Sequence, residues 1–212
     1  MPASAKPARR RTKSVGGKPD HKGVSIERIV DAAVEILADR GLEGLTTAEV
    51  ARRLDVSQPT LYSHIRNLDH IRSLTAIRGM QELSERVRSA VEGLEGDDAL
   101  RAMAFAYRGF VRDYPALYML QQRAPSTEEF WEEAPRAARP VRQVLRSYGV
   151  PEDQVPHVHL VFRASIHGFV DQEINNAIPD VPDTDVSFEL FLRFLTDGIK
   201  HLAAEAKRPR RR

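Results

Sequence analysis

Gln58, Pro59, Thr60, Tyr62 and His64 fall in one short stretch, and their side chains can contact nucleic acid. A glutamine forms paired hydrogen bonds with adenine in the major groove, while proline and threonine make apolar contact with a thymine methyl. Tyrosine and histidine carry polar tips that reach phosphate oxygens. These residue types therefore indicate a surface that contacts DNA, provided that one short helix presents them together.

Helix-start signals place this stretch on such a helix. Ser57 is a helix N-cap. Pro59 lies in the first turn, where a missing N–H costs nothing because that group has no partner within the helix. The sequence therefore predicts a helix over about 58–65, with Leu61 and Ile65 facing inward.

A second short helix precedes it. Thr46 and Glu49 have the spacing of a capping box, which predicts a helix from about Thr47 to Leu54. Three residues connect the two helices, and Asp55 among them must adopt the left-handed backbone of a tight turn, at some energetic cost. The pair is predicted to form a helix-turn-helix.

Apolar residues at helical spacing predict one more helix upstream, capped by Ser25 and ended by Gly41. The alternative is that Gln58 and its neighbours lie on a solvated helix of an ordinary bundle, and each residue taken alone favours that alternative. Leu45 with Val50, and Val56 with Leu61, also have the spacing of hydrophobic staples. The combination of caps, staples, three-residue turn and proline-opened helix is much more restrictive, and it favours the helix-turn-helix.

The string GLEGLTTAEVARRLDVSQPTLYSHIRN resembles the helix-turn-helix of the tetracycline-repressor (TetR) family of bacterial transcription regulators. The resemblance covers about residues 25–70, and the LTT and QPTLY strings are close to those of the tetracycline repressor itself. It implies that Thr47 and Tyr62 touch the sugar-phosphate backbone and that Gln58 faces a base. The predicted DNA-binding residues are Thr47, Gln58, Pro59, Thr60, Tyr62, Ser63, His64 and Arg66.

Several positions depart from the family pattern. The family usually has glycine where Asp55 stands, an aromatic residue at Ile65 and a phosphate-gripping lysine at Leu68. The missing lysine implies weaker clamping of the DNA backbone, or compensation by other basic residues such as Arg66. Ala48 stands where some relatives carry a base-reading arginine, which implies a different operator sequence.

The formal net charge of +2 is unevenly distributed along the 212 residues. Residues 1–23 hold seven Lys or Arg against one Asp, a net +6, and the terminal KRPRRR holds +5, which leaves −9 for residues 24–206. Both ends are poor in apolar residues, so we expect residues 1–24 and 207–212 to be disordered basic tails. Such tails would raise the affinity for a polyanion without selecting a sequence.

The chain contains no cysteine, which excludes disulfides, thiolate nucleophiles and sulfur-ligated metals. It has neither an apolar run long enough to span a membrane nor the apolar core of a signal peptide. We therefore expect a cytoplasmic protein with no membrane partner, and the family resemblance implies that it is bacterial.

Downstream, residues 71–206 are predicted to form a larger all-α region for ligand binding and dimerisation, giving about nine helices in the whole chain. Asn67 and Asp97 are the expected N-caps of two long helices. Pro135 and Pro140 must kink or split a later helical segment.

The middle helices hold many large side chains. Such residues are usually core, but tyrosines, methionines and the only tryptophan beside a proline break are also typical of an apolar ligand pocket. The predicted pocket residues are Met103, Tyr107, Phe110, Tyr114, Tyr118, Trp131, Phe162 and His167. The segment RASIHGFVDQE resembles a class of regulatory domains with a Trp-His-Gly signature, here Ile166-His167-Gly168.

The last helix carries an apolar stripe broader than one neighbouring helix covers, so we expect it to meet another chain. In the family, the corresponding pair of helices meets its symmetry mate as a four-helix bundle. The predicted dimer-interface residues are Phe169, Phe191, Phe194, Leu195 and Ile199. A fully intramolecular core is the alternative.

Catalysis is the weakest interpretation. His157 and His159 are two residues apart, whereas metal-binding pairs on helices are spaced by three or four, and no phosphate-binding or nucleophile motif occurs. We expect no catalytic residue, cofactor or metal. The predicted function is a homodimeric repressor that binds a palindromic double-stranded DNA operator and responds to an apolar small-molecule effector. The alternative is a constitutive DNA-binding or architectural protein without a ligand.

Overall fold

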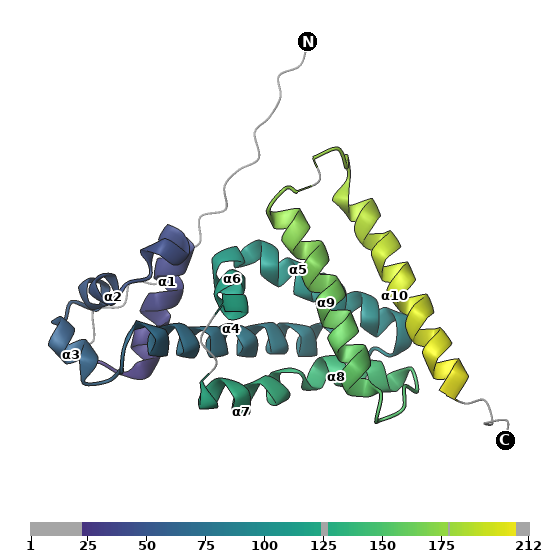
Figure 1. The fold of residues 1–212 in the computed structure, drawn as a ribbon, viewed down its shortest axis with the longest axis horizontal. Helices are drawn as coiled ribbons and strands as arrows, with labels where there is room; N and C mark the ends of the chain where they lie inside the picture. Colours follow the sequence, from purple (N-terminus) through teal and green to yellow (C-terminus); the bar gives the residue numbers. More distant parts are fainter. Residues whose placement is uncertain (1–22, 124–126, 178, 207–212) are drawn as a thin grey trace, which may run out of the picture.

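A computed structural model describes residues 23–123, 127–177 and 179–206, and these residues form ten α-helices and no strand. The predicted all-α fold is confirmed (Figure 1). The predictions for the basic tails concern residues that, apart from Gly23 and Val24, lie outside the described part of the chain. In order the helices are α1 Ile26–Gly44, α2 Thr47–Leu54, α3 Gln58–Tyr62, α4 Leu68–Ala90, α5 Gly96–Asp113, α6 Pro115–Arg123, α7 Glu128–Ala137, α8 Arg139–Ser147, α9 Val155–Ile174 and α10 Thr184–Ala206.

Helices α1, α2 and α3, here called the headpiece, begin at the predicted caps. The side chains of Ser25, Thr46 and Ser57 each accept a hydrogen bond from the backbone N–H three residues later, at 3.3, 3.1 and 3.2 Å. Gly41, the predicted end of α1, has φ of 66° and interrupts the helix, although one more turn follows it. Local capping chemistry therefore sets the three starts.

Helix α3 ends at Tyr62, three residues before the predicted end. The N–H groups of Ser63 and His64 donate to carbonyls three residues back, which tightens the chain out of the α-helix. The Ser63 hydroxyl also donates to the Thr60 carbonyl oxygen at 2.7 Å. Leu61 and Ile65 nevertheless point inward as predicted, with 0% and 4% of their surface exposed.

Helix α4 joins the headpiece to the body, which consists of α5 to α10. It runs along the long axis of the molecule (Figure 1) and contacts α1 as well as α5, α6, α7 and α8. Its predicted cap is formed, because the Asn67 side-chain oxygen accepts from the His70 N–H at 2.9 Å. The buried Ile71 and Val87 place α4 in a hydrophobic core that continues from α1 to α10.

One helix start in the body differs from its predicted cap, and the predicted proline break takes the form of a split. Helix α5 begins at Gly96, and Asp97 does not cap it, since the Asp97 carboxylate accepts from Lys200 at 2.5 Å and from the Tyr148 hydroxyl at 3.1 Å. The predicted proline break is a complete split at Ala138, with Pro140 in the first turn of α8. This split makes ten helices out of the expected nine or so. No helix among the described residues is long and apolar enough to cross a membrane.

Candidate DNA-reading surface, interior cavity and apolar helix-pair face

The outer face of α3 carries the side chains predicted to read DNA. Gln58, Pro59 and Thr60 are exposed in its first turn, and 47% of the Tyr62 surface is exposed. Ser63, His64 and Arg66 follow in the exposed segment after α3, and Thr47 is half-buried at the start of α2. The structure therefore brings all eight predicted residues to α3 and its immediate surroundings.

The turn before α3 fixes how this face is presented. Asp55 has φ of 55° and ψ of 48°, the left-handed conformation predicted for it. The Val56 N–H donates to the Ala51 carbonyl oxygen at 3.0 Å, which closes the turn. Leu61 is fully buried beneath α3, and the first-turn residues Gln58, Pro59 and Thr60 are exposed around it.

Carboxylates neutralise several arginines of the headpiece. Glu49 is only 9% exposed and accepts from Arg52 Nε at 2.8 Å, with Arg40 at 3.3 Å. The hydrogen bond from Arg52 is the main cause that lowers the pKa of Glu49. Arg53 pairs with Asp39 at 2.8 Å. These ion pairs hold α2 against α1.

Arg66 connects the headpiece to the body at what we call the α4–α7 junction, formed by Arg66, His70, Ser73, Thr127 and Glu129. The Arg66 guanidinium lies 3.3 Å from the Glu129 carboxylate, and the Ser73 and Thr127 hydroxyls are 2.8 Å apart. The Arg66 N–H donates to His70 Nδ1 at 3.2 Å. Burial and the nearby Arg66 lower the pKa of His70, so its imidazole is neutral and can accept this bond.

A cavity of about 190 Å³ lies among α4, α6, α7, α8 and α9. Most of its wall is apolar, as ligand sites usually are. Polar side chains reach it from α5, α6 and α9. The lining residues are Met80, Leu83, Ser84, Val87, Tyr107, Gln121, Gln122, Phe130, Trp131, Ala134, Ala137, Ala138, Val141, His159, Phe162 and Arg163.

Three of the eight predicted pocket residues, Tyr107, Trp131 and Phe162, line this cavity. Met103, Phe110, Tyr118 and His167 are not among its lining residues. They belong to the packed interior or its edge, where the Tyr107 hydroxyl donates to the Tyr118 oxygen at 3.2 Å and Tyr118 contacts His167 Nδ1. Tyr114 is 43% exposed and packs on Phe110.

The cavity residues that the sequence prediction missed are mostly small or polar. Phe130, Ala134 and Ala137 recur at helical spacing on α7, and no residue of α7 is buried. The helical spacing of these apolar residues is the one signal of this wall that the sequence carries. His159 and Arg163, four residues apart on α9, line the cavity on either side of Phe162.

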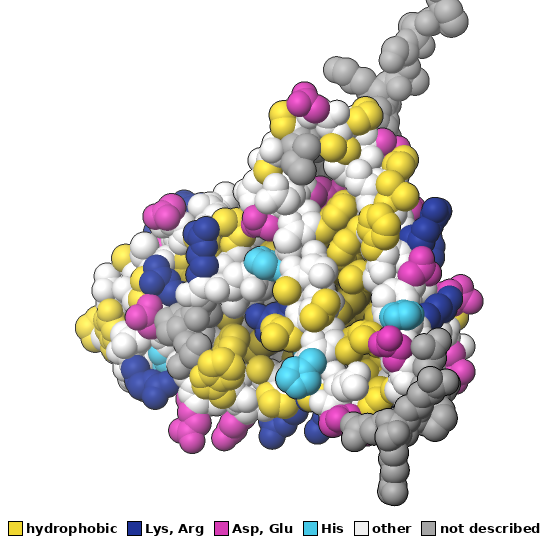
Figure 2. All heavy atoms as spheres, turned by 45° about the vertical axis from the view of Figure 1, so that its right-hand side comes forward, with side chains coloured by type: hydrophobic (Ala, Val, Ile, Leu, Met, Phe, Trp, Pro, Cys, Tyr) yellow, Lys and Arg dark blue, Asp and Glu magenta, His cyan; other side chains and the backbone are white. Residues whose placement is uncertain are grey.

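Helices α9 and α10 expose an apolar face. Phe194 is 74% exposed, Leu160 64% and Val161 60%. A groove of about 610 Å³ between the two helices is lined by Val161, Phe194, Leu195 and Ile199, among others. Figure 2 shows the hydrophobic side chains gathered over this pair of helices.

The other predicted interface residues contribute to the groove unevenly. Ile199 is 4% exposed and Leu195 is half-buried, so both form the floor from which Phe194 projects. Phe169 and Phe191 stack within the protomer, with ring centroids 5.3 Å apart, beside the buried Phe188. They support the face rather than form its most exposed part.

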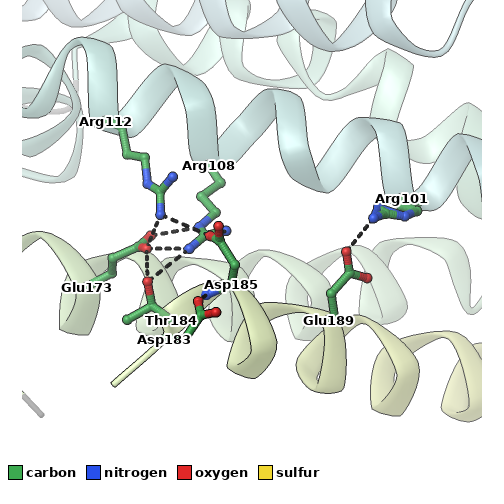
Figure 3. Close-up of polar contacts among 8 residues, drawn as sticks. All are labelled: Arg101, Arg108, Arg112, Glu173, Asp183, Thr184, Asp185 and Glu189. Atoms are coloured by element: carbon green, nitrogen blue, oxygen red, sulfur yellow. Dashed lines mark hydrogen bonds and ion pairs between the residues drawn. The ribbon is translucent and has the colours of Figure 1, made fainter. Parts of the chain in front are cut away.

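A buried cation holds this helix pair against α5. Only 2% of the Arg108 side chain is exposed, and its Nε donates to Glu173 at 2.8 Å while Nη1 lies 2.7 Å from Asp185 (Figure 3). Arg112 and the Thr184 hydroxyl also donate to Glu173. Although burial raises the pKa of Glu173, the hydrogen bonds from Arg108, Arg112 and Thr184 lower it to about 2.

Comparison with known proteins agrees with this arrangement. Residues 29–67 match the model of bacterial regulatory proteins of the tetR family, and residues 100–195 match that of the tetracyclin repressor-like C-terminal domain. The chain is 32% identical over 188 residues to the uncharacterized HTH-type transcriptional regulator Rv0681 of Mycobacterium tuberculosis, covering 87% of this chain and 83% of that protein. The chain belongs to the TetR family. It is a DNA-binding transcriptional regulator.

Shorter and more distant matches fit the same picture. The tetracycline repressor of class D from Escherichia coli is 49% identical over 41 residues, 19% of each chain. The TetR regulator SCO7222 of Streptomyces coelicolor superposes with a TM-score of 0.69 at 22% identity, over 85% of this chain and 99% of that one. BioQ, solved with its natural double-stranded DNA operator, gives 0.65 at 20% identity over 84% and 98%. These structures share the fold of this TetR regulator.

The first prediction concerns the α9–α10 face of the regulator. Val161→Glu with Phe194→Glu places two charges on its exposed apolar surface, and we expect a monomer that keeps its helicity because both side chains point to solvent. Sedimentation velocity and circular dichroism measure the two properties. Leu94→Glu, at an exposed leucine in the α4–α5 connection, is the control and should stay dimeric. A dimer that survives the double substitution would place the interface elsewhere.

The second prediction concerns Arg108. Arg108→Met leaves Glu173 and Asp185 without their buried partner and should lower the free energy of unfolding by about 3–5 kcal/mol. Arg101→Met removes the exposed Arg101–Glu189 pair between the same two helices and should cost no more than about 1 kcal/mol. Urea unfolding measures the loss of unfolding free energy in each variant. Equal losses would show that burial does not make the Arg108 network more stabilising than an exposed ion pair.

The same network predicts a pH dependence. Because the pKa of Glu173 is about 2 in the folded chain against a usual 4.5, its contribution to stability is complete above about pH 4.5 and is lost as the pH falls towards 2. Urea unfolding as a function of pH should therefore show a steeper acid loss for the parent chain than for Arg108→Met. Parallel curves would show that Arg108 does not set the pKa of Glu173.

Proposed function

We propose that this regulator is a homodimeric repressor that a small molecule releases from a palindromic operator. Two headpieces would lie in successive major grooves, about 34–36 Å apart, with Gln58 and its neighbours against the base edges. The α9–α10 face would join the protomers. The exposed face of α3, the exposed apolar face of α9 and α10 and the cavity in the body support this proposal.

The α4–α7 junction is the observation that carries the effector response. Glu129, which pairs with the predicted phosphate contact Arg66, directly precedes Phe130 and Trp131 of the cavity wall. Thr127, which caps α7, is also bonded to Ser73 of α4. A molecule that moves α7 must therefore move the partner of Arg66 or break this contact.

This contact sets up a competition for one guanidinium. With α7 in the position seen here, Arg66 pairs with Glu129, and on DNA the same side chain would pair with a phosphate. An effector that favours the present position of α7 would hold Arg66 away from the DNA backbone. By linkage, operator DNA would weaken effector binding by the same factor.

The third prediction tests base reading. Gln58→Ala should weaken binding to the best operator, selected from random or genomic fragments, by about 1–3 kcal/mol, since a side chain that pairs with a base contributes to sequence discrimination. Binding to random DNA should stay almost unchanged. Fluorescence anisotropy on both DNAs at one salt concentration measures this, and equal losses on the two would remove Gln58 from the base-reading set.

The fourth prediction tests the competition for Arg66. Glu129→Gln removes the partner charge with little change in shape, so operator affinity should rise by about two- to fivefold, as expected for one exposed ion pair. Glu128→Gln is the matched control, because this neighbouring glutamate is exposed and forms no ion pair with the described residues. Anisotropy titration of both variants on the same operator is the measurement. A gain shared by both would reflect net charge alone, and no gain in either would contradict the competition.

A further inference from the structure

The cavity wall specifies the chemistry of its occupant as well as its shape. Met80, Leu83 and Val141 supply aliphatic surface, and Phe130 and Trp131 supply aromatic surface. Trp131 is 63% exposed while it lines the cavity, so the cavity reaches solvent beside this residue. An apolar chain or ring can enter there and displace water from these side chains.

One polar group inside the wall lacks a partner. Gln121 Nε2 is buried and makes no hydrogen bond to any described residue. This nitrogen lies against Gly79, where a Cβ atom would be only 2.2 Å away, so the glycine leaves room for the Gln121 amide. An unsatisfied buried donor is costly, and an acceptor atom on a bound molecule would remove that cost.

The residues that line the cavity carry positive charge and no negative charge, while Glu132 and Glu133 of α7 lie beside them in the sequence. Arg163 lines the cavity and forms no ion pair with the described part of the chain, and none of the described lining residues is acidic. Burial, together with Arg142 and Arg163, lowers the pKa of His159 to about 4, so this imidazole is neutral at physiological pH. Arg142 Nε is itself buried without a hydrogen-bond partner among the described residues. Among its lining residues the cavity therefore offers donors and positive charge to an anionic group, and no carboxylate to a cationic one.

We propose that the effector is an amphipathic carboxylate, with its acid group at Gln121 and Arg163 and its apolar part between α4 and α7. The inference rests on the effector response proposed above and gives that effector a chemical class. A carboxylate supplies acceptors to the Gln121 amide, to the Arg163 guanidinium and to the single N–H of the neutral His159 imidazole. Phe130 and Trp131 then cover the apolar part of the molecule.

Three probes of matched shape test the class: 4-phenylbutyrate, 4-phenylbutan-1-ol and 4-phenylbutylamine. Each is titrated calorimetrically into the full-length chain without DNA, and Trp131 emission is followed in parallel because it is the only tryptophan. The carboxylate should bind about tenfold more tightly than the alcohol, since charge-assisted hydrogen bonds are roughly twice as strong as neutral ones. The amine should bind most weakly. Equal affinities, a preference for the amine, or no binding by any probe would overturn the proposal.

Substitutions identify the residues that cause the carboxylate to bind more tightly than the alcohol. Arg163→Met keeps an unbranched side chain without the charge and should abolish the advantage of the carboxylate, while alcohol binding changes less than about twofold. Gln121→Leu should also weaken the binding of 4-phenylbutyrate. Arg146→Met, at an exposed arginine of α8 that pairs with Glu152, is the control and should keep the tenfold preference. A preference that persists in Arg163→Met would overturn the assignment of this residue.

A DNA measurement separates this inference from the proposed function. If 4-phenylbutyrate binds with the expected preference but does not weaken operator binding, the effector response is wrong and the ligand class stands. If the probes show no carboxylate preference while the selected operator is still bound through Gln58, the ligand class is wrong and DNA recognition stands.

Discussion

Helix α4 must bury side chains against two groups of helices at once, and the rest of the architecture follows from this requirement. Its first turns place Ile71 and Ser73 at the headpiece end, and Val87 lies near the other end in the body. A helix packed along its whole length cannot bend freely between the two groups. The position of α3 relative to α9 and α10 is therefore set by how α4 sits among α1, α5, α6 and α7.

Much of the headpiece could be predicted because its signals are local. Ser25, Thr46 and Ser57 each bond a backbone N–H three residues away, so sequence spacing alone determines these helix starts. The left-handed Asp55 follows from the length of the turn. The early end of α3 was missed because it depends on weak competition among backbone bonds in a helix of only five residues.

The cavity was harder to predict because its residues come from six separate helices or connections. A large aromatic side chain does not reveal whether it is enclosed in the packed interior, as Tyr118 is, or lines a cavity while partly exposed, as Trp131 does. Small residues such as Ala134 and Ala137 line the space, and no sequence motif marks a small residue as a cavity wall. Asp97 was misread for a similar reason, since its partner Lys200 is distant in sequence.

The ion pairs of the headpiece have a consequence for how the regulator meets DNA. Arg40, Arg52 and Arg53 of the headpiece, and Arg66 just after it, already pair with carboxylates, so each of them must exchange one anion for another before it can neutralise a phosphate. Such an exchange frees a carboxylate to recruit cations from solution, which offsets part of the counterion release that normally drives association. The described part of the headpiece therefore gains less from low salt than its arginine content indicates, and discrimination between sequences accounts for a larger share of its binding free energy.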